Sequence, residues 1–199
     1  DGSALQFNGD VQGLVTFPGS ADFYNFYPRG YTVSAWVNMP QSTGTWRAYV
    51  SKEGVLPNNT RCGYILTSDG GGVAVHTLRQ SFNDQFSGTD IDGGNWHLVV
   101  GTYDGAAKEG KVYVDGILKN QTVNTGVLTP SPADLLFGAQ SPDGSSSPYV
   151  GLLDDVRIYS YAVDSIEVAK LYTDFNPGSE ICVGNPQFDV AGPDGIGDQ

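Results

Sequence analysis

The sequence predicts an all-β fold of short antiparallel strands with one short helix near the C-terminus. Gly (27), Pro (11), Tyr (11) and Phe (9) are abundant, a composition typical of many short strands joined by tight turns. Several stretches alternate apolar and polar residues with a period of two and are bounded by turn residues. A complete helix-start signal occurs at residue 164.

The first half of the chain contains most of the predicted strands. Two short strands are expected on either side of the turn signal Asn8-Gly9. A clean alternation from Tyr31 to Asn38 predicts a strand whose Trp36 lies in the core. Further strands are expected at about 47–51, 61–67 and 73–80, separated by turns rich in Gly and Asn.

The second half adds a buried strand over 96–104 and a hairpin centred on Asp115-Gly116. A strand begins at 135, and another runs through 151–159, where alternation places Leu152, Asp154, Val156 and Ile158 on one face. The helix follows. Asp164 caps it, Glu167 completes a capping box, and Val163 and Val168 stand at the hydrophobic-staple positions.

Length and charge exclude several classes of protein. The 199 residues suit one sandwich domain. The formal net charge of −12 would repel a nucleic-acid backbone, so we expect no DNA or RNA partner. The sequence contains no apolar run long enough to span a membrane.

Asp154 and Asp155 are adjacent carboxylates in an otherwise apolar strand. Burying them is costly unless a partner compensates their charge. Calcium prefers hard oxygen ligands, so the pair predicts a structural Ca²⁺ ion.

Four stretches, in order, carry a resemblance to a known family. They are ALQFNGDVQGLVTFPGS, YTVSAWVNMP, NWHLVVGTYDG with GKVYVDGIL, and GLLDDVRIYSYAVDSIEVAKLY. Together they resemble the laminin G-like (concanavalin A-like lectin/glucanase) domains of secreted bacterial proteins, over about residues 3–175. The resemblance implies a two-sheet antiparallel jelly-roll sandwich and an extracellular location.

The same resemblance implies a calcium site where a bend in the first strand meets the closing strand. Carried over to this chain, its ligands are Asn8, Asp154 and Asp155, completed by backbone carbonyls. For Asn8, simple turn chemistry is an equally good explanation.

A cationic and aromatic cluster in residues 44–86 stands out in this acidic chain. Trp46 offers an apolar face to a sugar ring, and Arg61 and Arg79 offer forked donors to hydroxyls or carboxylates, with His76 beside them. The alternative is that each arginine pairs with a nearby aspartate. We interpret Trp46, Arg61, His76 and Arg79 as a candidate ligand-binding set.

No enzyme signature is present. The four glutamates are all assigned to turns, a cap or a linker, and no hydrolase triad, phosphate loop or zinc spacing occurs. We therefore expect a non-catalytic module that binds a polysaccharide or glycan. A protein-interaction or adhesion domain is the alternative, and a lyase using His76, Tyr64 and Arg79, or a hydrolase, is a third.

We expect two segments: a laminin G-like domain over 1–175, and over 176–199 a linker with the truncated start of a dockerin-like calcium loop. The module is expected to be monomeric and tethered to other domains of a larger secreted protein. Cys62 and Cys182 leave two alternatives open, a disulfide between them or a Cys182 partner beyond residue 199.

Overall fold

The computed structural model describes residues 3–10, 13–18, 24–26, 29–42, 44–79, 83–123, 128–174 and 180–182. For Ser3, Arg79, 83–87 and 180–182 it describes the backbone alone. No helix in this part of the chain is long and apolar enough to cross a membrane.

Two sheets make up the fold, and sheet A has the strand order β11-β10-β9-β3-β13-β1-β14. Its neighbours are antiparallel except for β1 and β14, which pair in parallel. The strands of sheet A are β1 (Ser3–Asn8), β3 (Gly30–Asn38), β9 (Trp96–Asp104), β10 (Glu109–Val114), β11 (Ile117–Val123), β13 (Val150–Tyr159) and β14 (Glu180–Cys182).

Sheet B is antiparallel and has the order β2-β12-β4-β6-β7-β8, with β5 pairing to β6 beside this path. Its strands are β2 (Val15–Phe17), β4 (Arg47–Ser51), β5 (Gly54–Val55), β6 (Arg61–Ser68), β7 (Val73–Arg79), β8 (Asn83–Asp90) and β12 (Leu135–Phe137). The all-β sandwich predicted from the sequence is confirmed.

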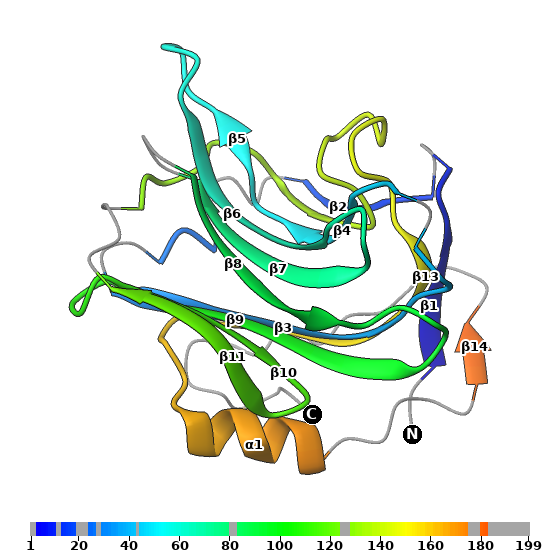
Figure 1. Ribbon diagram of the computed structural model, residues 1–199. Coiled ribbons are helices and arrows are strands. Elements are labelled where there is room, and N and C mark those ends of the chain that lie inside the picture. Colours follow the sequence, from blue (N-terminus) through cyan, green and yellow to red (C-terminus); the bar gives the residue numbers. More distant parts are fainter. Residues whose placement is uncertain are drawn as a thin grey trace, which may run out of the picture.

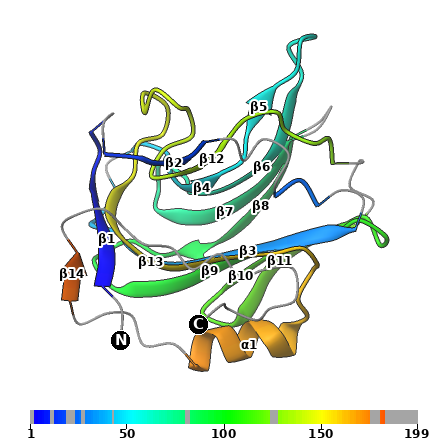
Figure 2. The same cartoon turned by 180° about the vertical axis from the view of Figure 1, so that it is seen from behind.

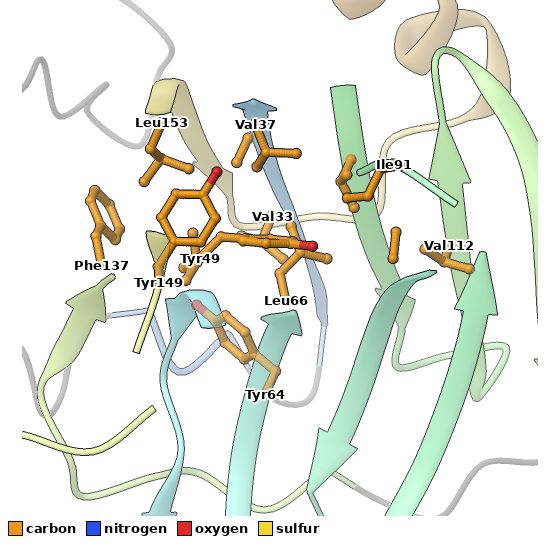
Figure 3. Packing of buried hydrophobic residues seen from close by; sticks show 14 of the residues in the cluster. Val33, Val37, Tyr49, Tyr64, Leu66, Ile91, Val112, Phe137, Tyr149 and Leu153 are labelled. Atoms are coloured by element: carbon orange, nitrogen blue, oxygen red, sulfur yellow. The ribbon is translucent and has the colours of Figure 1, made fainter. Parts of the chain in front are cut away.

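The main core lies between the two sheets (Figures 1 and 2). Inward side chains of β3, β4 and β6 meet there, among them Val33, Tyr49 and Tyr64 (Figure 3). The one helix of the described residues, α1 (Ser165–Thr173), covers part of the outer face of sheet A (Figure 1). A second cluster under α1 includes Trp36, whose ring stacks on Tyr172 with centroids 5.5 Å apart.

Local signals in the sequence account for the start of α1 and for one hairpin. Asp164 accepts from the backbone N–H groups of Ile166 and Glu167, and the Glu167 side chain accepts from the Asp164 N–H. This is the predicted capping box. Asp115 and Gly116 have φ values of 53° and 77°, as a two-residue turn between antiparallel strands requires.

The alternation predicted for β13 is wrong beyond Asp154, because the strand contains a bulge there. The pairing of β13 with β3 shifts between Asp154 and Arg157, and Asp155 has a φ of 42°. The extra residue reverses the facing of the residues that follow it. Leu153 therefore faces the core, and so do Val156 and Ile158 beyond the bulge.

The structure also changes two expectations about the C-terminal segment. Residues 180–182, predicted as part of a linker, form β14 beside β1. Cys62 is a buried free thiol, so the structure does not support its disulfide with Cys182. The dockerin-like stretch after 182 lies outside the described residues.

Candidate functional site

The outer face of sheet B is closely packed along its centre. Ile65 and Thr67 of β6, and Val75 and Thr77 of β7, point away from the core residues that alternate with them. All four are almost completely buried. Groups that could touch a ligand therefore lie at the ends of these strands rather than in the middle.

Trp46 is one such group. It immediately precedes β4, and its side chain is 41% exposed. Within β4, Arg47 pairs with Ser68 and Ala48 with Thr67. Strand alternation therefore places Trp46 on the same outer face as Ala48. The exposed part of the indole offers an apolar aromatic face that a ligand could contact.

Three loops meet at the Trp46 end of the sandwich and brace one another. They comprise residues 39–42 with 44–46, 69–72 and 90–94. The Gly44 N–H donates to the Gly70 carbonyl at 3.1 Å, and the Ser42 hydroxyl donates to the same oxygen at 2.6 Å. The Ser42 N–H donates to Asp92 Oδ2 at 2.7 Å. We call this end of the molecule the Trp46 surface.

Carboxylates of the Trp46 surface were not among the predicted site residues. Asp69 Oδ1 accepts from the N–H groups of Gly71 and Val73 at 2.8 and 3.0 Å. Asp90 is exposed and lies near Asp92, since a Cβ placed on Gly72 would be within 3.0 Å of oxygens from both. The turn sequences SDGGG and DIDGG signal these loops, but nothing in them shows that the loops adjoin Trp46.

Arg61 lies at the opposite end of β6. Ser68 pairs with Arg47, the residue next to Trp46. It is seven residues from Arg61, or roughly 23 Å along the strand. The half-exposed guanidinium pairs with Glu53, a carboxylate that also accepts from Gln140 Nε2 at 3.0 Å. The alternative of an arginine paired with an acid is therefore realised, with a glutamate in place of the expected aspartate.

His76 does not reach any surface. Its ring lies between the sheets with no exposed area. Nδ1 is 3.0 Å from the Lys111 carbonyl and Nε2 is 2.7 Å from the Tyr31 hydroxyl. The carbonyl can only accept, so Nδ1 carries the proton and Nε2 accepts from Tyr31. Burial lowers the pKa of His76 to about 4. Its assignment to a ligand site is wrong, because strand alternation turns it inward.

Arg79 pairs through its backbone with Gly63 at the Arg61 end of the sheet, and its side chain lies outside the described residues. The four predicted ligand residues thus do not form one cluster. Trp46 and Arg61 occupy opposite ends of sheet B, and His76 is in the core.

The predicted calcium ligands do not converge either. Asn8 lies opposite Val150, whereas Asp154 is four residues further along β13, about 13 Å away. Calcium contacts its oxygen ligands at about 2.3–2.6 Å, so one ion cannot bind both. Asp155 Oδ1 instead accepts from Arg157 Nε at 2.8 Å, and Asn8 bonds to Asp10. The described residues contain no group of three acidic, His or Cys side chains able to hold a metal.

Comparisons with known proteins agree with this architecture. The model of the concanavalin A-like lectin/glucanases superfamily matches residues 8–169. No curated protein matches the chain. Among solved structures, the CBM40 domain of the Ruminococcus gnavus IT-sialidase is 14% identical with a TM-score of 0.60, covering 72% of this chain and 82% of that one.

Two other solved structures have similar folds. The heptameric SAP-like pentraxin of Limulus polyphemus is 17% identical with a TM-score of 0.55, covering 73% of this chain and 70% of the pentraxin. The Trypanosoma rangeli sialidase is 18% identical with a TM-score of 0.61, covering 85% of this chain but 26% of the sialidase. The fold and the match over most of its length show that the chain belongs to the concanavalin A-like lectin/glucanases superfamily, as a laminin G-type domain.

Proposed function

We propose that this chain is a non-catalytic carbohydrate-binding module of a larger secreted protein, and that Trp46 provides its main contact with the glycan. The observation that carries the proposal is the exposed indole on the outer face of sheet B, held beside three braced loops. Sugar rings present apolar C–H faces that pack on an aromatic ring, while loop carbonyls and carboxylates accept from their hydroxyls. Similarity to a sialidase CBM40 domain supports a glycan ligand.

The superfamily also includes glucanases by name, so the non-catalytic part of the proposal needs its own support. Three of the four glutamates serve structural contacts: Glu53 with Arg61, Glu109 with Lys111, and Glu167 in the capping box. The side chain of Glu180 lies outside the described residues. Asp90 and Asp92 come close together, but Asp92 braces Ser42. Release of soluble sugars from a polysaccharide, abolished by Asp90→Asn, would overturn this part.

Affinity electrophoresis through gels containing polysaccharides tests the binding itself. We expect at least one polysaccharide to retard the wild type and Trp46→Ala to lose that retardation, with Trp46→Phe retaining most of it. Tyr161 is a matched control, because it is a similarly exposed aromatic that lies between β13 of the other sheet and α1. Tyr161→Ala should bind as the wild type does. Absence of retardation across a broad panel, or equal retardation of Trp46→Ala, would contradict the proposal.

One observation favours protein interaction as a second candidate function. The β10–β11 turn packs on α1, where Gly116 lies beside Ala169 and Tyr172. Ile117 is 59% exposed next to this contact, and Ile166 of the same helix is 66% exposed. Two large exposed apolar side chains on elements that contact one another are compatible with an interaction surface. Ile117→Lys should leave retardation by polysaccharides unchanged. Loss of binding to a protein partner in Ile117→Lys, with that binding kept in Trp46→Ala, would support the second function.

A further inference from the structure

We infer that the Trp46 surface selects uncharged glycans and discriminates against anionic ones. The inference rests on the proposed function and specifies its ligand class. It depends on two observations: the three loops contain acidic residues, and no basic side chain of the described residues is exposed beside them.

All the charges contributed by these loops are negative. Asp69, Asp90 and Asp92 come from the two loops that bond to Ser42 and Gly44, shortly before Trp46. Asp90 is exposed, and Asp69 and Asp92 are half-buried. No Lys or Arg occurs in the sequences 39–46, 69–72 or 90–94. These loops therefore bring carboxylates and no cation to the end of the sandwich where Trp46 lies.

The nearest basic residue in sequence, Arg47, is buried against a residue of this surface and is not exposed on it. It pairs with Ser68 on the inward side of β4, is 5% exposed, and donates from Nη1 to the Pro40 carbonyl at 3.4 Å. Its guanidinium is therefore not presented to a ligand on the outer face. The half-exposed Arg61 lies at the far end of β6 and its charge is compensated by Glu53.

The carboxylates are held in place by the loops themselves. Asp69 and Asp92 each accept hydrogen bonds from backbone N–H groups, which orient the two carboxylates. A carboxylate has about four lone-pair sites, so these groups can also accept hydrogen bonds from sugar hydroxyls. A uronate or sulfate at the same place offers acceptors only and adds like-charge repulsion.

The test compares pairs of polysaccharides that share a backbone and differ in charge. Suitable pairs are hydroxyethylcellulose with carboxymethylcellulose, highly esterified with de-esterified pectin, and dextran with dextran sulfate. In affinity electrophoresis at low ionic strength, we expect the neutral member of any binding pair to be bound at least tenfold more tightly. The difference should narrow in 0.5 M NaCl, because salt screens exposed charges.

A charge variant links the preference to this surface. Asp90→Asn should narrow the preference for the neutral member by about threefold and leave the melting temperature unchanged. Asp174→Asn makes the same change of charge at the end of α1, on the other side of the sandwich, and should leave the preference unchanged. Tighter binding of the anionic members, still lost in Trp46→Ala, would overturn the inference and leave the proposed function standing. Absence of binding in every pair would remove both.

Discussion

His76 Nε2 accepts a hydrogen bond from the Tyr31 hydroxyl at 2.7 Å in the centre of the sandwich. The imidazole has no exposed area, and its Nδ1–H is directed to the Lys111 carbonyl. Acceptance of the Tyr31 hydrogen bond by Nε2 requires the neutral ring. A protonated ring would place a second N–H against the Tyr31 oxygen and a charge in the core, which burial disfavours.

Protonation of His76 should therefore make the fold acid-sensitive. The pKa is about 4 in the folded protein and about 6.5 in an unfolded chain, so the unfolded state binds more protons between these values. Stability is full above pH 6.5 and falls as the pH drops towards 4. The difference between the two pKa values corresponds to about 3 kcal/mol in the free energy of unfolding. Urea unfolding across this pH range measures it. His76→Leu should flatten this part of the profile.

Gly101 allows the His76 ring to lie against β9. A Cβ atom at position 101 would be 2.6 Å from ring carbons Cγ and Cδ2. Gly101→Ala should lower the free energy of unfolding by about 1–3 kcal/mol, because the packed ring cannot move aside. Gly71→Ala is the control, since its nearest neighbour would be Asp69 Oδ1 at 3.4 Å. A near-neutral Gly101→Ala would mean that the ring has room to shift.

The Tyr149 side chain stabilises the start of β13 through its hydroxyl group. Its buried hydroxyl donates to the Leu152 carbonyl at 2.9 Å and lies 3.3 Å from the Asn38 carbonyl. Tyr149→Phe removes the donor and leaves a buried acceptor, which should cost about 1–3 kcal/mol in chemical denaturation. Tyr172→Phe should cost much less, because the half-exposed Tyr172 contributes its ring stacked on Trp36. Equal effects of the two substitutions would contradict this role.

Asp155 and Arg157 provide a test of the calcium prediction. If the ion pair is the role of Asp155, Asp155→Asn lowers stability by up to about 1 kcal/mol, as expected for a partly exposed pair. The loss should be the same in calcium and in EDTA, and it should not add to that of Arg157→Gln. Thermal melts measure both. Stabilisation of the wild type by calcium that disappears in Asp155→Asn would instead identify Asp155 as a metal ligand.

Local patterns were sufficient to predict most of the framework. Turn and alternation signals predicted β4, β6 and β7 to within a residue or two, and Asp164 with Glu167 predicted the start of α1. These features are set by interactions between residues close in sequence. The β13 bulge was not predictable in this way, because an added residue in a strand shows only in its pairing with β3.

The site was harder to predict, because sequence proximity says little about where side chains point. Trp46, Arg61 and His76 fall within 31 positions, yet they occupy one end of sheet B, the other end, and the core. Period-two alternation could have turned His76 inward with Ala74 and Leu78. Nothing local could have joined Gly70 and Asp92 to Ser42 in the Trp46 loop, since those contacts cross 28 and 50 positions.

The parallel pairing of β14 with β1 has a mechanical consequence. Ser3 begins β1, and Cys182 ends β14 beside Leu5. A pulling force transmitted through the two ends of the chain in opposite directions along these strands would strain their shared backbone hydrogen bonds together instead of opening them one at a time. Tension would therefore be resisted at the edge of sheet A, away from the loops that hold Trp46.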